Sequence, residues 1–393
     1  MKIGIDKIGF FAPQLYVDMV DLAKARGVDP DKFTIGIGQE KMAVAPQTQD
    51  SVTLAANAAK PILTTEDKQT IDLVIFATET GVDHSKSGAA YLHRLLGLKP
   101  GVRSFEVKQA CYAATAGIQM AKGHISLHPE SKVLVVASDI ARYGLNTGGE
   151  VTQGAGAVAM VISSNPRILS FEEPSTLLTD DIMDFWRPAY SETAFVDGRY
   201  SNEQYLRFFT YIWEEHKAAT RLSLKDYEAL CFHVPYTKMG LKALRTVLDE
   251  GDEIAQERLI AHFEKSILYN KNIGNIYTGS LYLSLVSLLE QSELTDGHRV
   301  GLFSYGSGAV GEFFSGVLQP GYEQQLHKSV HESLLETRQA LSVEEYEAIF
   351  RKTIPTDGSD VEFDISSDPA PIVLAGMREH QRMYVAKKEV HAK

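Results

Sequence analysis

The sequence predicts an α/β fold built around a mainly parallel sheet. Short apolar runs, bounded by polar residues or glycine, alternate with stretches of helical length, and this alternation is typical of α/β proteins. The runs resemble strands that are buried on both faces of a sheet. We expect strands at residues 72–79, 132–139, 229–236 and 299–306, and helices at residues 111–127 and 277–291.

The composition indicates a globular protein with a large core. The chain has 393 residues, of which 44% are hydrophobic and 23% charged, and this length suggests two domains or one duplicated domain. Two cysteines are too few for a disulfide framework. Residues 1–20 carry charged side chains instead of an apolar secretion signal, and no apolar run approaches the ~18 residues of a membrane span. We therefore expect a cytoplasmic protein with no membrane partner.

The net charge argues against a nucleic-acid partner. It is −12 at pH 7, whereas a nucleic-acid surface requires a basic stripe. An anionic ligand must then be held by a local group of cations. Lys238 and Lys242 form such a pair, because residues four apart share one face of a helix. They are candidates for binding a phosphate-bearing ligand, and a solvated charged face is the alternative.

A weak internal repeat predicts duplication. Residues 152–164 and 304–316 share the pattern Gly-x-Gly-Ala-Val, and residues 71–87 resemble residues 227–243 at nearly the same separation. A chance coincidence of two strand-plus-glycine patterns is the alternative. The position of the second half that corresponds to Cys111 falls near Thr278, so only the first half carries the thiol.

The repeat divides the chain into four segments. Residues 1–167 and 227–317 are the two similar halves. Residues 168–226 are an aromatic-rich insert with both tryptophans, and they suit either a cap over a pocket, a subunit interface or ordinary core. Within the insert, SNEQ (201–204) predicts a capping box that opens a helix to about residue 219. Residues 318–393 are charged, and we expect a helical extension with a peripheral structural role.

The C-terminal extension carries its own helix signal. Ser342 and Glu345, in LSVEEYEAIF, have the spacing of a capping box. They predict that a helix begins at this point.

Cys111 is the first candidate for chemistry. It stands before a run of Ala, Thr and Gly that a helix can carry, and a thiolate at a helix N-terminus has a lowered pKa. A buried structural cysteine is the alternative. Cys231, inside a predicted strand, has no such setting, and we expect it in the core.

Polar residues at the ends of predicted strands complete a candidate site. Glu79 and His233 end corresponding strands of the two halves, where ligands gather in parallel sheets. Asn275 opens the helix opposite Cys111, either to orient a ligand or as a simple cap. The glycine loop at 304–310 resembles a phosphate cradle without the Lys-Ser/Thr of a P-loop. Its amides, with Ser307, could hold a carbonyl or thioester oxygen.

Several stretches together resemble the bacterial 3-hydroxy-3-methylglutaryl-CoA synthases of the thiolase superfamily. The resemblance runs from GIDKIGFFAP to about residue 320. It is carried by QACYAATAG (109–117), ATETGVDHSKS (77–87), FHVPYTKMGLK (232–242), GNIYTGSLY (274–282) and SYGSGAVGEFFSG (304–316). It implies a thiolase-like fold, a duplicated βαβαβ in α-β-α-β-α layers, and a homodimer.

The resemblance also implies roles for single residues. Cys111 would accept acetyl from acetyl-CoA, Glu79 would take a proton from the acetyl methyl, and His233 would polarise the ketone of acetoacetyl-CoA. The remaining positions would bind substrate: Asn275 and Ser307 the acetoacetyl thioester, Thr152 and Ser201 the CoA chain or acyl group, and Lys238 and Lys242 the CoA phosphates. The product would be 3-hydroxy-3-methylglutaryl-CoA for the mevalonate route. No metal or redox cofactor is expected, because the thioester acidifies the methyl group.

One position departs from the family, and other classes remain open. Family members often carry two glycines where this chain has Ala113 and Ala114, which leaves less room beside the acyl group. A type III ketoacyl synthase could use Cys111, His233 and Asn275 but has no use for a base at Glu79. A degradative thiolase would need a second cysteine near the end of the second half. A papain-like hydrolase and a non-catalytic CoA-binding protein are the remaining alternatives.

Overall fold

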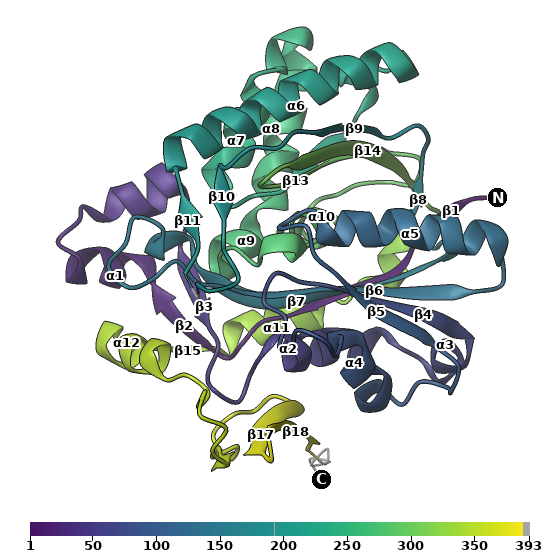
Figure 1. The fold of residues 1–393 in the computed structure, drawn as a ribbon. Helices are drawn as coiled ribbons and strands as arrows, with labels where there is room; N and C mark the ends of the chain where they lie inside the picture. The colour runs from purple at the N-terminus through teal and green to yellow at the C-terminus, as the bar shows by residue number, and fades with distance from the viewer. Residues whose placement is uncertain (192, 388–393) are drawn as a thin grey trace.

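One large sheet organises the chain. The computed structural model describes residues 1–191 and 193–387. Its main sheet has ten strands in the order β12-β13-β14-β8-β1-β7-β6-β4-β5, with β9 paired to β14 (Figure 1). The strands are β1 (Ile3–Phe11), β4 (Ile71–Ala77), β5 (Arg103–Val107), β6 (Lys132–Ala141), β7 (Gly154–Ser164), β8 (Leu169–Phe171), β9 (Thr176–Thr179), β12 (Ala229–Phe232), β13 (Arg299–Gly306) and β14 (Val310–Leu318). All four strands expected from the sequence are present.

The sheet is mixed, so the expectation of a mainly parallel sheet is wrong. Only β4–β5, β4–β6 and β12–β13 are parallel pairs within this sheet. Its other pairings, including β6–β7 and β13–β14, are antiparallel. The reason is the connections: residues 142–153 and 307–309 join consecutive strands without a crossover helix, which a parallel pair requires.

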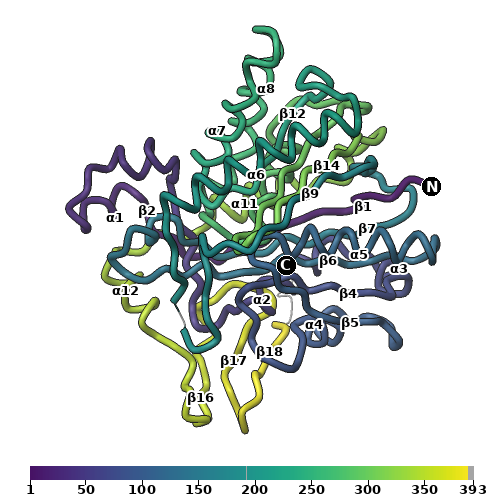
Figure 2. Tube along the Cα trace, turned by 45° about the horizontal axis from the view of Figure 1, so that its top comes forward, coloured from purple at the N-terminus to yellow at the C-terminus, as the bar shows by residue number. Residues whose placement is uncertain are grey.

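Helices and sheet form the expected α-β-α-β-α layers. Helices α5 and α10 lie in the middle, between the two halves of the sheet, while α2 and α4 cover one outer face and α6, α7 and α8 the other (Figures 1 and 2). Side chains alternate accordingly: Ile75 packs toward α5 and Phe76 toward α2 and α4. The helices are α1 (Met19–Ala25), α2 (Ser51–Ala59), α3 (Thr65–Thr70), α4 (Gly88–Leu96), α5 (Ala113–Leu127), α6 (Gly198–Thr220), α7 (Thr237–Arg245), α8 (Glu253–Ser266), α9 (Leu268–Ile273), α10 (Ser280–Gln291), α11 (Lys328–Glu336) and α12 (Val343–Arg351).

The duplication is visible in the strand order. In the first half β6 lies between β7 and β4, antiparallel to the former and parallel to the latter. In the second half β13 lies between β14 and β12, and it is antiparallel to β14 and parallel to β12. Strands β1 and β8 then join the halves into one sheet. The similar stretches in the sequence therefore occupy equivalent positions. Cys231 is fully buried in β12, as expected for a core residue.

The glycines of the repeated pattern lie where the two halves touch. A Cβ atom at Gly306 would lie 2.5 Å from the Gln109 carbonyl oxygen and 2.6 Å from the Tyr112 nitrogen. A Cβ atom at Gly154 would lie 2.7 Å from the Asn275 carbonyl oxygen. Because glycine has no Cβ atom, each of these positions lets the turn before the central helix of the other half pack closely against it. Close packing, rather than a phosphate, requires glycine at both positions.

Helix α6 begins earlier than the SNEQ motif (201–204) predicted. The helix starts at Gly198, and the side chain of Asp197 accepts a hydrogen bond of 3.0 Å from the Tyr200 amide. Asp is as favourable an N-cap as Ser, and here it precedes the whole amphipathic segment. Ser201 consequently lies within the first turn of the helix and does not cap it.

The insert is partly core and partly surface. Phe208, Phe209 and Trp213 of α6 are fully buried against β13 and β14, so ordinary core accounts for these aromatic residues. Strands β8 and β9 belong to the main sheet. The remaining segment forms a short hairpin, β10 (Phe185–Trp186) with β11 (Phe195–Val196), outside the sheet.

The C-terminal segment is not entirely helical, which corrects the sequence-based expectation. The capping box of Ser342 and Glu345 opens α12 as predicted. Beyond α12, however, the chain forms a small sheet of β16 (Val361–Glu362), β17 (Ile372–Arg378) and β18 (Gln381–Ala386). Its apolar residues 372–374 are fully buried in the core beneath α2, which favours a strand there (Figure 2). Two further strands, β2 (Leu15–Asp18) and β3 (Lys41–Val44), form another small sheet with β15 (Gln339–Ala340).

The C-terminal hairpin is anchored by the N-cap of α2. One carboxylate oxygen of Asp50 accepts hydrogen bonds from the amides of Val52 and Thr53, both at 3.0 Å. The other accepts from Arg382 at 2.9 Å and from the Tyr384 hydroxyl at 2.8 Å. One carboxylate thus caps a helix and fixes a hairpin that is distant in sequence. None of the helices in the described ranges is long and apolar enough to cross a membrane.

We predict that Asp50→Ala lowers the free energy of unfolding by about 2 kcal/mol, because it removes both the helix cap and the partner of one buried donor, Tyr384, and one partly buried donor, Arg382. Tyr384→Phe, the matched control, deletes one of these hydrogen bonds and should cost about 1 kcal/mol. Urea unfolding followed by circular dichroism measures both. Equal stability of the two variants would contradict the anchoring role of Asp50.

Candidate active site

Cys111 and Glu79 are in contact. Cys111 lies two residues before α5 and is half-buried, and its Sγ donates a hydrogen bond to Glu79 Oε1 at 3.4 Å. Glu79 follows the end of β4, and the turn of Cys111 follows β5, which is parallel to β4. Because the carboxyl ends of parallel strands meet at one edge, the fold brings the two side chains together.

A buried carboxylate shapes the loop of Glu79. Asp139, in β6 next to β4, is fully buried. Its Oδ1 accepts hydrogen bonds from the Glu79 amide at 2.8 Å, from the Thr80 amide at 3.0 Å, and from the hydroxyls of Thr78 at 2.9 Å and Thr80 at 2.8 Å. The sequence analysis missed Asp139. Its signal was an acidic residue at the end of the predicted strand 132–139.

The electrostatics of the pair differ from the sequence-based expectation. Burial and the charge of Asp139 raise the pKa of Glu79 to about 8, although Arg187 opposes the shift. Burial raises the pKa of Asp139 to about 6. Burial, with the nearby carboxylates of Glu79 and Asp139, raises the pKa of the Cys111 thiol well above its usual value. The prediction of a lowered thiol pKa is therefore wrong, because desolvation and negative charge outweigh the helix N-terminus.

The second half of the molecule holds the turn of Cys111 from the other side. The Ala114 amide donates a hydrogen bond to Thr278 Oγ1 at 2.7 Å. In the internal repeat, Thr278 is the residue of the second half that corresponds to Cys111. The Tyr112 hydroxyl donates to Glu312 of β14 at 2.6 Å, and the Thr115 hydroxyl donates to Ser304 of β13 at 2.7 Å.

Ala113 and Ala114, which replace the glycines frequent in the resembled family, are fully buried in the core between the halves. Their methyl groups therefore occupy space next to the nucleophile turn. The effect on rate stays a prediction.

His233 directly follows β12, as predicted, and is 2% exposed. Its amide donates to the Phe303 carbonyl at 2.8 Å, and its carbonyl accepts from the Tyr205 hydroxyl at 2.5 Å. Within the described ranges, Nδ1 has no hydrogen-bond partner and no hydrogen bond joins the ring to Cys111 or Glu79. Burial lowers the pKa of His233 to about 3, so the imidazole is neutral at physiological pH.

Asn275 lies in a polar cluster with tyrosines that the sequence analysis did not single out. Its Oδ1 accepts from the Tyr277 amide at 2.8 Å, and its Nδ2 donates to the Tyr143 hydroxyl at 3.1 Å. The Thr152 carbonyl accepts from the Asn275 amide at 3.3 Å, so these two predicted residues are neighbours. Burial raises the pKa of Tyr143, and the neighbouring Cys111 and Glu79 add to the shift, which places this cluster beside these two residues.

Ser201 and the glycine loop that contains Ser307 are linked through another buried carboxylate. Asp184, in the insert, accepts from the Gly308 amide at 2.8 Å and from the Tyr305 hydroxyl at 2.7 Å, and the Ser201 hydroxyl donates to it at 3.4 Å. The Ser307 carbonyl accepts from Gln109 Nε2 at 3.4 Å, beside the Cys111 turn. The Gly308 amide is therefore already used by the protein.

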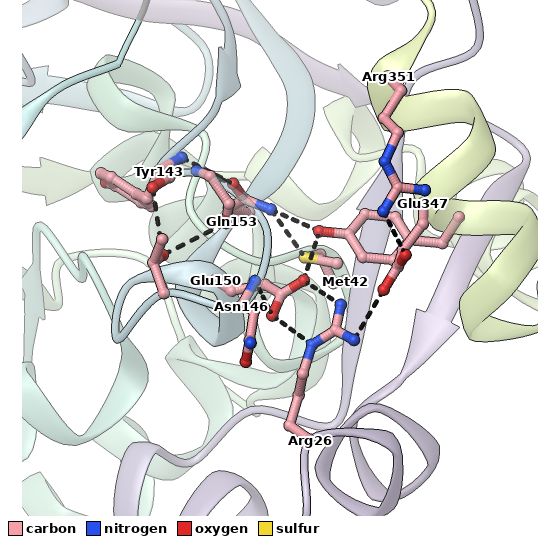
Figure 3. Close-up of polar contacts among 11 residues, drawn as sticks. Arg26, Met42, Tyr143, Asn146, Glu150, Gln153, Glu347 and Arg351 are labelled. Atoms are coloured by element: carbon pink, nitrogen blue, oxygen red, sulfur yellow. Dashed lines mark hydrogen bonds and ion pairs between the residues drawn. The ribbon is translucent and has the colours of Figure 1, made fainter.

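The loop that carries Tyr143 is fixed by a polar network (Figure 3). Gln153 Oε1 accepts from the Tyr143 amide at 2.7 Å, and Gln153 Nε2 donates to the Tyr346 hydroxyl at 2.8 Å. Glu150, 3% exposed, accepts two hydrogen bonds from Arg26, at 2.7 and 2.8 Å, and one from Tyr346 at 3.2 Å. Because Tyr346 belongs to α12, the C-terminal segment supports the site and its role is not merely peripheral.

A cavity of about 1430 Å³ opens next to Glu79. Among the residues that line it are members of the Glu79 loop, the Cys111 turn and the glycine loop (Glu79, Gln109, Ala110, Ser307), of the insert (Phe185, Arg187) and of the C-terminal segment (Phe350, Lys352, Arg382). Lys238 and Lys242 lie elsewhere, on α7, where the Lys242 ammonium donates to the Tyr236 hydroxyl at 3.1 Å. Neither lysine lines this cavity.

Comparison with known proteins agrees with this geometry. Residues 1–167 match the family model described as hydroxymethylglutaryl-coenzyme A synthase N terminal, and residues 245–357 match the model of the C terminal. The hydroxymethylglutaryl-CoA synthase of Enterococcus faecalis is 58% identical over 91% of this chain and 94% of its own length.

Solved structures give the same result. A crystal structure of HMG-CoA synthase complexed with CoA has a TM-score of 0.96 and 49% identity, covering 98% of this chain and all of that one. A structure of MvaS in complex with 3-hydroxy-3-methylglutaryl coenzyme A has a TM-score of 0.90 and 34% identity, covering 98% and 99% of the two chains. The chain belongs to the hydroxymethylglutaryl-CoA synthase family of acyl-transferring condensing enzymes.

Proposed function

We propose that the protein condenses acetyl-CoA with acetoacetyl-CoA and water to give 3-hydroxy-3-methylglutaryl-CoA and CoA, for the mevalonate route to isoprenoids. The observation that carries this proposal is the contact between Cys111 Sγ and Glu79 Oε1 beside a large cavity. A nucleophile and a carboxylate base at one point suit a reaction that first forms a thioester and then removes a proton from it.

The first step is transfer of acetyl to the enzyme. Cys111 Sγ attacks the carbonyl carbon of acetyl-CoA, the bond from this carbon to the CoA sulfur breaks, and the thiol proton leaves with that sulfur. The raised pKa of Cys111 means that the free enzyme holds a thiol rather than a thiolate. Proton transfer must therefore accompany the attack.

The second step makes the carbon nucleophile. Glu79, as the carboxylate, removes a proton from the methyl group of acetyl-Cys111, and the electron pair forms an enolate. A carboxyl whose pKa is about 8 is a far stronger base than an ordinary one near 4.3. The buried Asp139 carboxylate contributes to this shift. The proposal needs no metal or redox cofactor, because the thioester itself acidifies the methyl group.

The third step forms the carbon–carbon bond. The enolate carbon attacks the ketone of acetoacetyl-CoA, and the ketone oxygen becomes a hydroxyl. The neutral imidazole of His233 polarises this oxygen and donates the proton, a role that a neutral histidine can fill. The proton removed by Glu79 balances the one that the oxygen gains. Water then cleaves the thioester to Cys111 and leaves the new carboxylate on the product.

Several residues are proposed to bind substrate. Ser307, beside the Cys111 turn, and Asn275, in the tyrosine cluster, would position the acetoacetyl thioester. Of the glycine-loop amides that the sequence suggested for the same role, those of Gly308 and Ala309 already donate to Asp184 and to the Asp180 carbonyl. Thr152, next to Asn275, and Ser201 would contact the CoA chain or acyl group. Lys238 and Lys242 would meet the CoA phosphates as cations on one face of α7.

We also infer a homodimer and a cytoplasmic location. Strand β5 ends the main sheet on one side, as β12 does on the other, and an edge strand is a natural site for pairing with a second copy. Sedimentation over a range of protein concentrations tests this assembly. Cys111 and Cys231 are both free thiols, which a reducing cytoplasm preserves.

We predict that Cys111→Ser abolishes the acetyl adduct, whereas Glu79→Gln still becomes acetylated but condenses at least about a hundredfold more slowly, because it lacks the base. Intact-protein mass spectrometry after addition of acetyl-CoA and then acetoacetyl-CoA, with peptide mapping, measures both steps. Cys231→Ala and the exposed Glu66→Gln are the controls, and both should behave as the unaltered protein. Full synthesis by Glu79→Gln would disprove the base assignment.

The proton-removing step should depend on pH in an unusual range. With acetyl-CoA alone in deuterated water, we expect deuterium to enter the acetyl group on Cys111 at a rate that rises with pH and levels off above about pH 8. The sign follows from Glu79, which accepts a proton only in its ionised form, and the ionised fraction rises with pH until the pH passes its pKa. Mass spectrometry of the Cys111 peptide measures the exchange. A midpoint between pH 4 and 5 would show an ordinary carboxyl and contradict the account.

A further inference from the structure

The insert around strand β10 contacts the candidate site at three points. Asp184 is fully buried and binds the Gly308 amide, as described above. Phe185 packs edge-on against Tyr143, with ring centroids 6.0 Å apart. Two residues further on, Arg187 reaches the loop of Glu79. The insert therefore contributes side chains to the site, which agrees with one of the alternatives that its aromatic composition suggested, a cap over a pocket.

Arg187 is directly bonded to the residue that we propose as the base. Its Nη2 donates a hydrogen bond to the backbone carbonyl of Glu79, and its half-buried side chain lines the same cavity. Within the described part of the chain, its guanidinium forms no ion pair with a carboxylate. Its charge is consequently not neutralised by a neighbour and acts on Glu79.

The charged and titratable groups around Glu79 come from every element that packs against it. They are Asp139 of β6, Cys111 before α5, Lys108 after β5, Tyr143 after β6, Tyr277 before α10 and Arg187 of the insert. Only Lys108 and Arg187 among them are cations. Lys108 is exposed, so solvent screens its charge, whereas Arg187 is half-buried and screened less.

We propose that Arg187 is a positioning residue for Glu79: it holds the backbone of the base through the carbonyl and places a positive charge beside a carboxylate that is otherwise surrounded by burial and negative charge. The inference rests on the proposed role of Glu79 as the base. Burial and Asp139 favour the protonated carboxyl, which cannot accept the methyl proton. Arg187 opposes them and keeps a useful fraction of Glu79 ionised at physiological pH.

The test is the pH profile of deuterium entry into acetyl-Cys111, measured in Arg187→Met, Arg187→Lys and the unaltered protein. We expect Arg187→Met to move the midpoint upward by about one pH unit, which is about a tenfold slower exchange at pH 7. Arg187→Lys keeps the positive charge, so its midpoint should stay close to that of the unaltered protein. The matched control is Arg199→Met, from the same insert, because Arg199 is 91% exposed and pairs with Glu203 at 3.0 Å. It should leave the profile unchanged.

The outcomes separate this inference from the proposed base. An unchanged midpoint in Arg187→Met overturns the inference when Glu79→Gln abolishes exchange in parallel. Exchange that persists in Glu79→Gln overturns the base assignment itself. Thermal unfolding and the rate of acetyl adduct formation are measured for each variant. If Arg187→Met does not fold, Arg187→Gln replaces it in the same comparison.

Discussion

The carboxylate of Asp139 lies where the loop of Glu79, the end of β6 and the second half of the molecule meet. Its Oδ1 binds four donors of residues 78–80, and its Oδ2 lies 3.4 Å from the Thr278 amide. Thr278 in turn accepts the amide of Ala114 in the nucleophile helix. Glu79, the helix that follows Cys111 and the interface between the two halves are thus fixed relative to one another around one buried group.

Burying a carboxylate is costly unless hydrogen bonds replace the lost water. Asp139 satisfies this condition, but its negative charge remains close to Glu79. The same charge that organises the loop therefore makes Glu79 a stronger base and Cys111 a weaker acid. In this arrangement the thiol does not need to be ionised in the resting enzyme. Arg187 of the insert opposes the effect of this negative charge on Glu79. A segment outside the two duplicated halves thus adjusts the chemistry of the site that the halves form.

Much of the framework could be predicted from the sequence because it follows from local patterns. The apolar runs gave the strands, and the shared glycines indicated the duplication. Glu79 and His233 were placed correctly at strand ends by periodicity alone. The resemblance to a known family then suggested which of these residues carry the chemistry.

The sequence-based predictions that failed concern features that depend on tertiary contacts. The helix N-terminus favoured a low pKa for Cys111, but the carboxylates that reverse this lie 28 and 32 residues away in sequence. Asp139 ends a predicted strand, as Glu79 does, but nothing local showed that it is buried against the Glu79 loop, and Arg187 carried no local signal that distinguished it from other basic residues. The strand at 372–378 was missed because its apolar side chains gain from packing beneath α2 rather than from their own segment. Antiparallel pairing was missed because it depends on the short connections between strands.

The most direct test of this account is the titration of Glu79 itself. Infrared difference spectroscopy of the carboxyl band, assigned by subtraction of Glu79→Gln, should show Glu79 losing its proton near pH 8. In Asp139→Asn, which keeps an acceptor oxygen for the loop but removes the charge, the titration should move to lower pH. A Glu79 that titrates near pH 4.3 in both proteins would contradict the central claim that burial and Asp139 make it a strong base.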